Sequence, residues 1–117
     1  MIIEERLKDG VRYNIVVDKQ EVIRDESSAL DLIGALYYSE SKNVIIPTIV
    51  IVDEFWDLKN TVAGNAFQKF VQYGIKIAIM GELENAGKSL KAFMIESNKG
   101  ENLFFVNTED EAIDKFK

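Results

Sequence analysis

Three short runs rich in apolar residues, each followed by a segment with helical spacing, constrain the fold of this chain more than any other feature. They occupy residues 43–46, 75–80 and 103–106. An apolar run without alternation is typical of a strand covered on both faces, as in a parallel sheet. Strands that alternate with helices need crossover connections, which favour parallel pairing. The order of elements over 117 residues therefore predicts a single α/β domain, residues 1–117, whose later strands are mostly parallel.

The first residues predict a β-hairpin. Two apolar-rich runs, 2–7 and 11–17, flank Asp9-Gly10, and Asp-Gly is a strong signal for a two-residue hairpin turn. Every second residue from Val11 to Val17 is apolar, which indicates a strand with one face turned inward. Residues 21–23 favour a short third strand. The domain is thus expected to begin with an antiparallel hairpin, followed by alternating helices and mostly parallel strands in one mixed sheet.

The segment after the hairpin carries the spacing of a capping box, with Ser28 at the N-cap and Asp31 three residues later. This spacing predicts a helix that runs to about Ser39. Its inward residues are expected to be Leu30, Ile33 and Tyr37. Pro47 ends the next strand, because proline cannot donate to a sheet ladder. Residues 48–52 then favour a strand by composition, and residues 53–58 favour a short helix or an ordered loop.

Three further helices are expected in the second half. The first is capped by Asn60 or Thr61 and stopped by Gly74 in a left-handed conformation. Its apolar stripe consists of Val62, Ala63, Ala66, Phe67 and Phe70. The second ends near Gly100, with one face formed by Leu90, Phe93, Met94 and Ser97. The last begins with the capping box at 108–111 and turns Ala112, Ile113 and Phe116 inward.

The segment IAIMGELENAGKSL, residues 77–90, resembles a phosphate-binding loop but departs from that pattern. The motif needs four residues between its two glycines, whereas Gly81 and Gly87 enclose five. Glu82 and Glu84 would also place negative charge beside phosphate groups. We therefore interpret the segment as a solvated loop, in which Gly87 and Lys88 begin a helix.

Composition excludes several classes of function. The chain has no His and no Cys, which removes the commonest general base, thiol chemistry and N/S zinc sites. The net charge of -6 argues against nucleic acid or an anionic membrane as the main partner. The first residues lack a basic n-region, and no apolar run reaches membrane length. We expect a cytoplasmic protein without a cofactor or metal.

The edge where parallel strands end is the expected place for a binding site. Three loops should meet there, at residues 47–60, 81–88 and 107–108, together with helix N-termini. The acids of these loops and first helical turns are Asp53, Glu54, Asp57, Glu82, Glu84, Glu109, Asp110 and Glu111. The only bases are Lys59 and Lys88. An acidic rim of this kind would attract a basic surface on a partner, although acids near helix N-termini also simply stabilise helices.

Phe55 and Trp56 lie in the least regular segment and allow two interpretations. Large aromatic residues in a loop can anchor an interface, or they can cap the core. Because acids are plentiful here, a catalytic carboxylate pair or a divalent cation stays open as well. Asp53 and Asp57 are too generic to be nominated for either role.

The chain resembles a small bacterial family known only as a domain of unknown function. The similarity lies in Phe55-Trp56-Asp57-Leu58, in 63–70, in Lys88-Ser89-Leu90, in 96–100 and in Phe104-Phe105-Val106. In the order of its elements, in the run 67–81 and in a last strand followed by 108–113, it also resembles STAS domains, the anti-sigma-factor antagonist fold. That resemblance implies a non-enzymatic module that binds a partner protein.

Many STAS domains are controlled by phosphorylation of a Ser or Thr that directly follows an Asp at the start of a helix. The corresponding place here is 57–61, where Leu58 stands instead of a hydroxyl residue, so the motif is broken. Thr61 is the nearest hydroxyl and the candidate for phosphorylation, although its plain role is a helix cap.

The sequence thus leads to a hypothesis of a STAS-like bacterial regulatory module that binds a protein through the acidic loop–helix edge around residues 47–64. The residues expected to bind are Phe55, Trp56, Asp57, Asn60, Thr61 and Gly64. The alternative is a small-molecule or lipid-binding module with an apolar pocket near Phe55, Trp56 and Phe67. An enzyme that uses carboxylate, lysine or hydroxyl groups ranks last. A homodimer through an edge strand or a helix face stays open.

Overall fold

A computed structural model describes residues 1–57, 59, 61–84 and 86–117. Leu58, Asn60 and Asn85 lie outside the described residues. The described strands are β1 (Ile3–Lys8), β2 (Val11–Val16), β3 (Asn43–Pro47), β4 (Lys76–Met80) and β5 (Leu103–Val106). The helices are α1 (Glu26–Ala35), α2 (Val62–Gln72), α3 (Lys88–Asn98) and α4 (Glu109–Phe116), with two short 3-10 helices, η1 (Thr48–Val50) and η2 (Asp53–Trp56).

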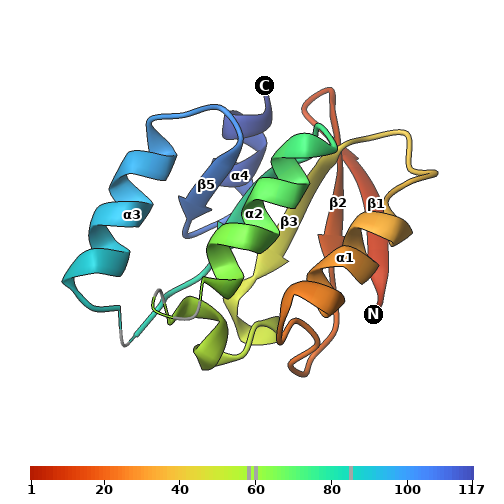
Figure 1. The fold of residues 1–117 in the computed structure, drawn as a ribbon. Coiled ribbons are helices and arrows are strands. Elements are labelled where there is room, and N and C mark those ends of the chain that lie inside the picture. Colours follow the sequence, from red (N-terminus) through yellow and green to blue (C-terminus); the bar gives the residue numbers. More distant parts are fainter. Residues whose placement is uncertain (58, 60, 85) are drawn as a thin grey trace.

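The five strands form one mixed sheet in the order β1-β2-β3-β4-β5 (Figure 1). β1 is antiparallel to β2, and each following pair of neighbours is parallel. The predicted fold class, an α/β domain with an N-terminal hairpin followed by mostly parallel strands, is confirmed. Because the order in the sheet equals the order in the chain, every crossover moves the chain one strand further in the same direction.

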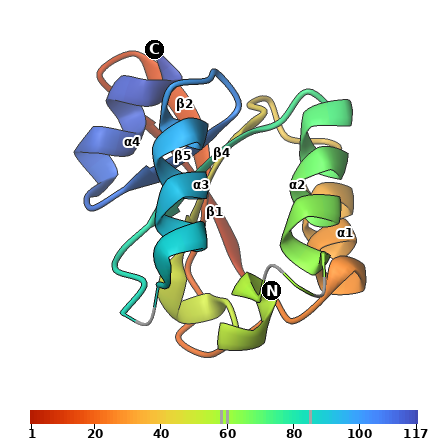
Figure 2. The same ribbon diagram turned by 60° about the vertical axis from the view of Figure 1, so that its left-hand side comes forward.

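Helices cover both faces of the sheet. Crossovers in parallel sheets are right-handed, so successive steps in one direction place their helices on one face. α1, α2 and α3 accordingly belong to one side, and α4, which follows the last strand, covers the other (Figure 2). The larger core lies under α1 to α3 and receives Val44, Ile46, Ile77 and Ile79 from the sheet. The smaller core lies under α4 and receives Ile45 and Ala78 among others.

The hairpin turn has the predicted geometry. Asp9 and Gly10 have φ angles of 53° and 78°, as a type I′ turn requires. β2 differs from its prediction, since it is buried on both faces from Tyr13 to Val16. The third strand predicted at 21–23 is wrong: it reduces to a single bridge between Ile23 and Ile51.

The predicted start and inner face of α1 are also wrong in part. Asp25, rather than Ser28, is the N-cap, and Asp25 Oδ1 accepts from the Ser28 amide at 2.9 Å, while Ser28 Oγ accepts from the Asp25 amide at 3.1 Å. The helix ends at Ala35 instead of near 39. The face turned to the core carries Ala29, Leu32 and the predicted Ile33, whereas Leu30 and Tyr37 are exposed.

Residues 48–52 do not form the strand that their composition predicts. β3 pairs with β4 up to Pro47, after which η1 turns the chain away from the sheet, and the Ile51 amide donates to the Thr48 carbonyl at 3.1 Å. The Val50 carbonyl accepts from the amides of Val22 and Ile23. Val50 and Ile51 are apolar because they are buried in the larger core, which is a different reason from strand formation.

The helices α2 and α4 follow the prediction closely, whereas in α3 only Leu90 of the expected face is buried and Phe93, Met94 and Ser97 are half-buried. At the end of α2 the Ile75 amide donates to the Phe70 carbonyl and the Gly74 amide to the Val71 carbonyl, a Schellman motif with Gly74 at φ 72°. The expected inner residues of α2 and α4 are buried, apart from half-buried Val62. Thr108 caps α4 by accepting from the Glu111 amide.

Candidate functional site

The carboxyl ends of β3, β4 and β5 lie at one edge of the sheet because the three strands are parallel neighbours. The segments that leave them, 48–57, 81–84 with 86–87, and 107–108, therefore begin side by side at this edge (Figure 1). We call it the carboxyl edge. It is where the sequence places its candidate site.

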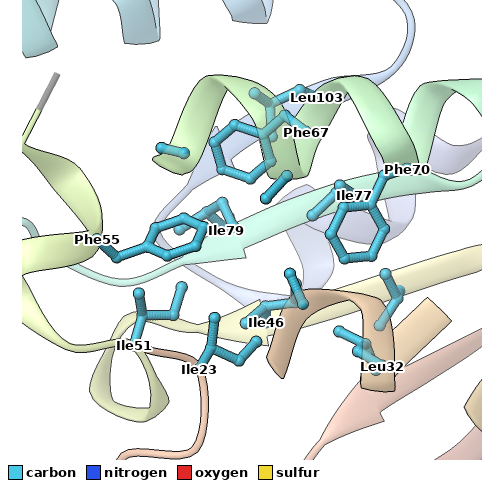
Figure 3. Close-up of a cluster of buried hydrophobic side chains, with 14 of the residues drawn as sticks. Ile23, Leu32, Ile46, Ile51, Phe55, Phe67, Phe70, Ile77, Ile79 and Leu103 are labelled. Carbon is cyan, nitrogen blue, oxygen red and sulfur yellow. The ribbon is translucent and has the colours of Figure 1, made fainter. Parts of the chain in front are cut away.

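Phe55 and Trp56 are part of the core. Their exposed fractions are 2% and 8%, and Figure 3 shows Phe55 directed toward the sheet near Ile79. The ring centroids of Phe55 and Trp56 lie 5.3 Å apart, and those rings lie 5.8 and 5.9 Å from Phe67. Trp56 also packs 5.7 Å from Phe105. This arrangement agrees with the core-capping interpretation of the two aromatic residues.

Trp56 carries a buried polar atom for which the described residues offer no partner. Among the described residues, its Nε1–H has no hydrogen-bond acceptor, although the atom is shielded from solvent. A buried donor that lacks a partner costs about 1–3 kcal/mol. Packing against the neighbouring rings, rather than a polar contact, therefore positions the Trp56 indole in the described structure.

The other sequence-predicted residues lie along the surface that follows η2. Asp57 is exposed, and its Oδ1 accepts from the Lys59 amide at 3.0 Å. Thr61 is exposed at the N-cap of α2 with φ 60° and makes no side-chain capping bond, so the predicted cap holds for its position but not for its hydroxyl. Its Oγ1 accepts from Asn65 Nδ2 at 3.5 Å. Gly64 is exposed in the first turn of α2.

Asn60 and Leu58 lie outside the described residues, so the roles predicted for them have no structural counterpart here.

The predicted acidic rim is divided between two places. Arg6 Nη1 donates to both carboxylate oxygens of Glu109, at 2.9 and 3.1 Å, and Lys8 Nζ lies 2.7 Å from Asp110. The buried Tyr13 hydroxyl also donates to Glu109. Burial first, and this hydrogen bond second, raise the pKa of Tyr13 to about 12. The first turn of α4 is thus tied to the hairpin by these contacts.

Three of the remaining acids, Asp53, Glu82 and Glu84, border a pocket of about 300 Å³ at the carboxyl edge. The pocket begins where β3 and β4 part, beyond their last paired residues, Pro47 and Met80. It is lined by Thr48, Ile49, Ile51, Asp53, Trp56, Glu82, Leu83, Glu84, Ala86 and Leu90. Six of these ten residues are apolar, and the three ionisable side chains are all acidic. We call it the fork pocket.

Gly81 fixes the base of the fork pocket. Its φ of 124° lies in a region that favours glycine. A Cβ at this position would lie 2.5 Å from Thr48 Oγ1. The two diverging segments can therefore approach this closely only because residue 81 has no side chain.

The two lysines of the edge line a second, more open hollow. Lys59 and Lys88 border it together with Gly87 and Ser89, and Asp53 and Trp56 separate it from the fork pocket by lining both. Lys88 directly follows an N-cap position, Gly87, that makes no side-chain cap in the described structure. The described lining of the fork pocket thus carries acids and no lysine, whereas the second hollow combines Lys59 and Lys88 with Asp53 and Asp57.

Sequence reasoning named the two loops of the fork pocket but missed most of its walls. Ile49, Leu83 and Ala86 carry no motif, and only the prediction that neighbouring parallel strands end together points to them.

Among the described residues, no group of three or more Asp and Glu side chains is arranged to hold a metal ion. No described helix is long and apolar enough to cross a membrane.

These features define a small mixed α/β domain with a pocket at the carboxyl edge of its sheet. Residues 8–116 match the model of DUF4180, described as a domain of unknown function. The chain belongs to this family. No curated protein and no solved structure matches it significantly.

Proposed function

We propose that this chain is a STAS-like bacterial regulatory module that binds a partner protein, without enzymatic activity, through the carboxyl edge around residues 47–64. One observation carries the proposal: a pocket with apolar walls and an acidic border opens at this edge. Ile49 stands at the pocket with 66% of its surface exposed, beside the partly exposed Leu83 and Ala86. Apolar surface surrounded by a polar rim is typical of a protein interaction site.

The residues at the edge favour binding over catalysis. The sequence has no His or Cys, so a reaction would have to rely on carboxylate, lysine or hydroxyl groups. Asp53, Glu82 and Glu84 are exposed side chains at the border of the pocket. A catalytic acid or base generally needs a partly buried environment that adjusts its pKa.

The alternative is a small-molecule or lipid-binding module, which the apolar walls of the fork pocket favour. A lipid tail would need a deep, enclosed cavity. The space between Phe55, Trp56 and Phe67 is occupied by ring contacts of 5.3 to 5.9 Å instead. The protein-binding proposal therefore fits the described core better.

Thr61 is the proposed position of a regulatory phosphate. Its side chain is exposed, and among the described residues its hydroxyl makes one long contact, with Asn65 at 3.5 Å. A phosphate would add about -1.5 to -2 charges to a segment that already carries Asp57. It would change the charge of the edge without disturbing the core.

Site-specific photo-cross-linking tests the proposed surface. A photoreactive residue is placed at Ile49 or at Asn65 of α2, and, as a control, at Tyr38, which is 91% exposed beyond the carboxyl end of α1. Cells that produce these variants are irradiated, and cross-linked proteins are identified by mass spectrometry. The same partner should be captured from Ile49 and Asn65 and not from Tyr38. A partner captured reproducibly from Tyr38 alone would contradict the proposal.

A further inference from the structure

We infer that the fork pocket receives a Lys or Arg side chain of the partner protein, together with an adjoining aliphatic residue; this inference rests on the proposed function. It assigns a ligand chemistry to a pocket whose described walls come from two segments, 48–56 and 82–84 with 86–90, that diverge from neighbouring strands. Both segments supply acidic and apolar side chains, and these two properties together define the occupant.

The ionisable groups of the pocket are of one sign. Asp53, Glu82 and Glu84 border it, and none of the lining residues is basic. The nearby lysines, Lys59 and Lys88, line the second hollow instead. Three carboxylates in a concave site produce a negative potential that favours a cation and disfavours an anion.

The walls select the rest of the occupant. Ile49, Leu83 and Ala86 are wholly or partly accessible, whereas Ile51 and Leu90 are buried behind them. A bare metal or ammonium ion would gain nothing from such walls. A Lys or Arg side chain can lay its methylene groups along apolar surface while its charged end reaches the carboxylates.

The size of the pocket limits the occupant further. A volume of about 300 Å³ lies at the lower end of the roughly 300–1,000 Å³ of small-molecule sites. It suits a pair of side chains better than a lipid or a nucleotide. Exposed Ile49 at its margin offers a contact for an aliphatic neighbour of the basic residue.

A matched series of small probes tests the charge preference directly. The purified chain is titrated with hexylguanidinium, hexanol and hexanoate, which share an apolar stem and carry a positive, a neutral and a negative head. Trp56 is the only tryptophan and lines the pocket, so its indole N–H gives a single NMR signal that reports occupancy. Hexylguanidinium should shift this signal, the other two should bind at least about threefold more weakly, and added salt should reduce the difference.

A double variant, Glu82→Gln with Glu84→Gln, tests the residues. Both side chains are exposed, so the fold should persist, and a thermal melt verifies this. Affinity for hexylguanidinium should fall by about threefold or more, which lies within the range expected for exposed ion pairs. Glu101→Gln, an exposed acid outside the pocket, is the matched control and should leave the affinity unchanged. Equal binding of the three probes, or an unchanged double variant, would overturn the inference.

Displayed peptides separate a protein segment from a free amine. A library of twelve-residue peptides is selected on the wild-type chain and on the double variant. Peptides with Lys or Arg beside Leu, Ile or Val should be enriched on the wild type only. Binding of hexylguanidinium without any such enrichment would refute a protein as the source of the cation.

The outcomes distinguish this inference from the proposed function. If hexylguanidinium and basic peptides bind but photo-cross-linking captures nothing, the proposed cellular role fails and the pocket chemistry stands. If a partner is captured from Ile49 and binds the Glu82→Gln, Glu84→Gln variant as well as the wild type, the inference fails and the proposed function stands.

Discussion

Gly81→Ala is the substitution with the sharpest expected consequence, because two separate costs meet at this residue. The Gly81 amide donates to the Val106 carbonyl at 3.0 Å, so its backbone is fixed beyond the end of β4. Its φ of 124° is strained for any L-residue. The new Cβ would also lie 2.5 Å from Thr48 Oγ1 and 3.5 Å from Thr48 Cβ and Cγ2.

The magnitude follows from adding the two costs. The backbone conformation costs a non-glycine residue on the order of 1–3 kcal/mol. The overlap with Thr48 forces a local shift worth roughly 1–3 kcal/mol. The free energy of unfolding should therefore fall by about 2–6 kcal/mol, a large share of the ~5–15 kcal/mol that stabilises a typical domain. At about 4 °C per kcal/mol, the melting temperature should drop by about 8–24 °C.

A double-mutant cycle measured by urea unfolding separates the two costs. Thr48→Ala removes Oγ1, the one atom within 3 Å of the added Cβ. In the double variant with Gly81→Ala, the overlap is absent, so the free energy of unfolding should recover by roughly 1–3 kcal/mol. The cost of the backbone conformation should remain. Gly34→Ala is the control, because this helical glycine has open space around it. That control should stabilise the chain by about 0.5–1 kcal/mol.

Two results would refute this reasoning. A loss below about 0.5 kcal/mol for Gly81→Ala would mean that neither cost exists in solution, since ordinary surface substitutions fall in that range. A double variant no more stable than Gly81→Ala would show that Thr48 is not the obstacle. In that second case residue 81 and the Thr48 side chain would not approach each other closely at the base of the fork pocket in solution.

Three further predictions test other contacts. The pKa of the buried Tyr13 hydroxyl is raised from 10.0 to about 12. The protonated hydroxyl therefore stabilises the fold fully below pH 10, and this contribution is lost as the pH rises toward 12. In thermal melts, Tyr13→Phe should remove that part of the loss of stability at alkaline pH. Asn98 accepts from the Phe105 amide at 2.7 Å and donates to its carbonyl at 3.2 Å; Asn98→Ala should cost about 1–3 kcal/mol in urea unfolding, and more than Asn98→Asp, which keeps the acceptor. Hydrogen bonds from Ser28 lower the pKa of Asp25 below 3.8, so the contribution of Asp25 is present above pH 4 and disappears at lower pH; the stability difference between wild type and Asp25→Ala should shrink as the pH falls below 4.

The errors in the sequence prediction share a physical cause. Residues 48–52 and 21–23 have the composition of strands, yet they lie beyond the ends of neighbouring strands and have no ladder to join, apart from the bridge between Ile23 and Ile51. In α1 two capping signals compete, and Asp25 with Ser28 prevails over Ser28 with Asp31. The choice between them depends on which helical face meets the core, where Leu32 is buried, and local spacing does not contain that information.

Sequence alone determined the elements whose signals are local: the Asp9-Gly10 turn, the stop at Gly74, the strands 43–46, 75–80 and 103–106, and hence the parallel sheet. Only the tertiary structure decided what the carboxyl edge is. Contacts between distant residues removed Glu109 from the acidic rim, placed Trp56 in the core and brought Ile49 and Leu83 to one pocket. Charge and hydrophobicity are properties of single residues, whereas a pocket is a property of their distances, and those distances are set by packing across the whole chain.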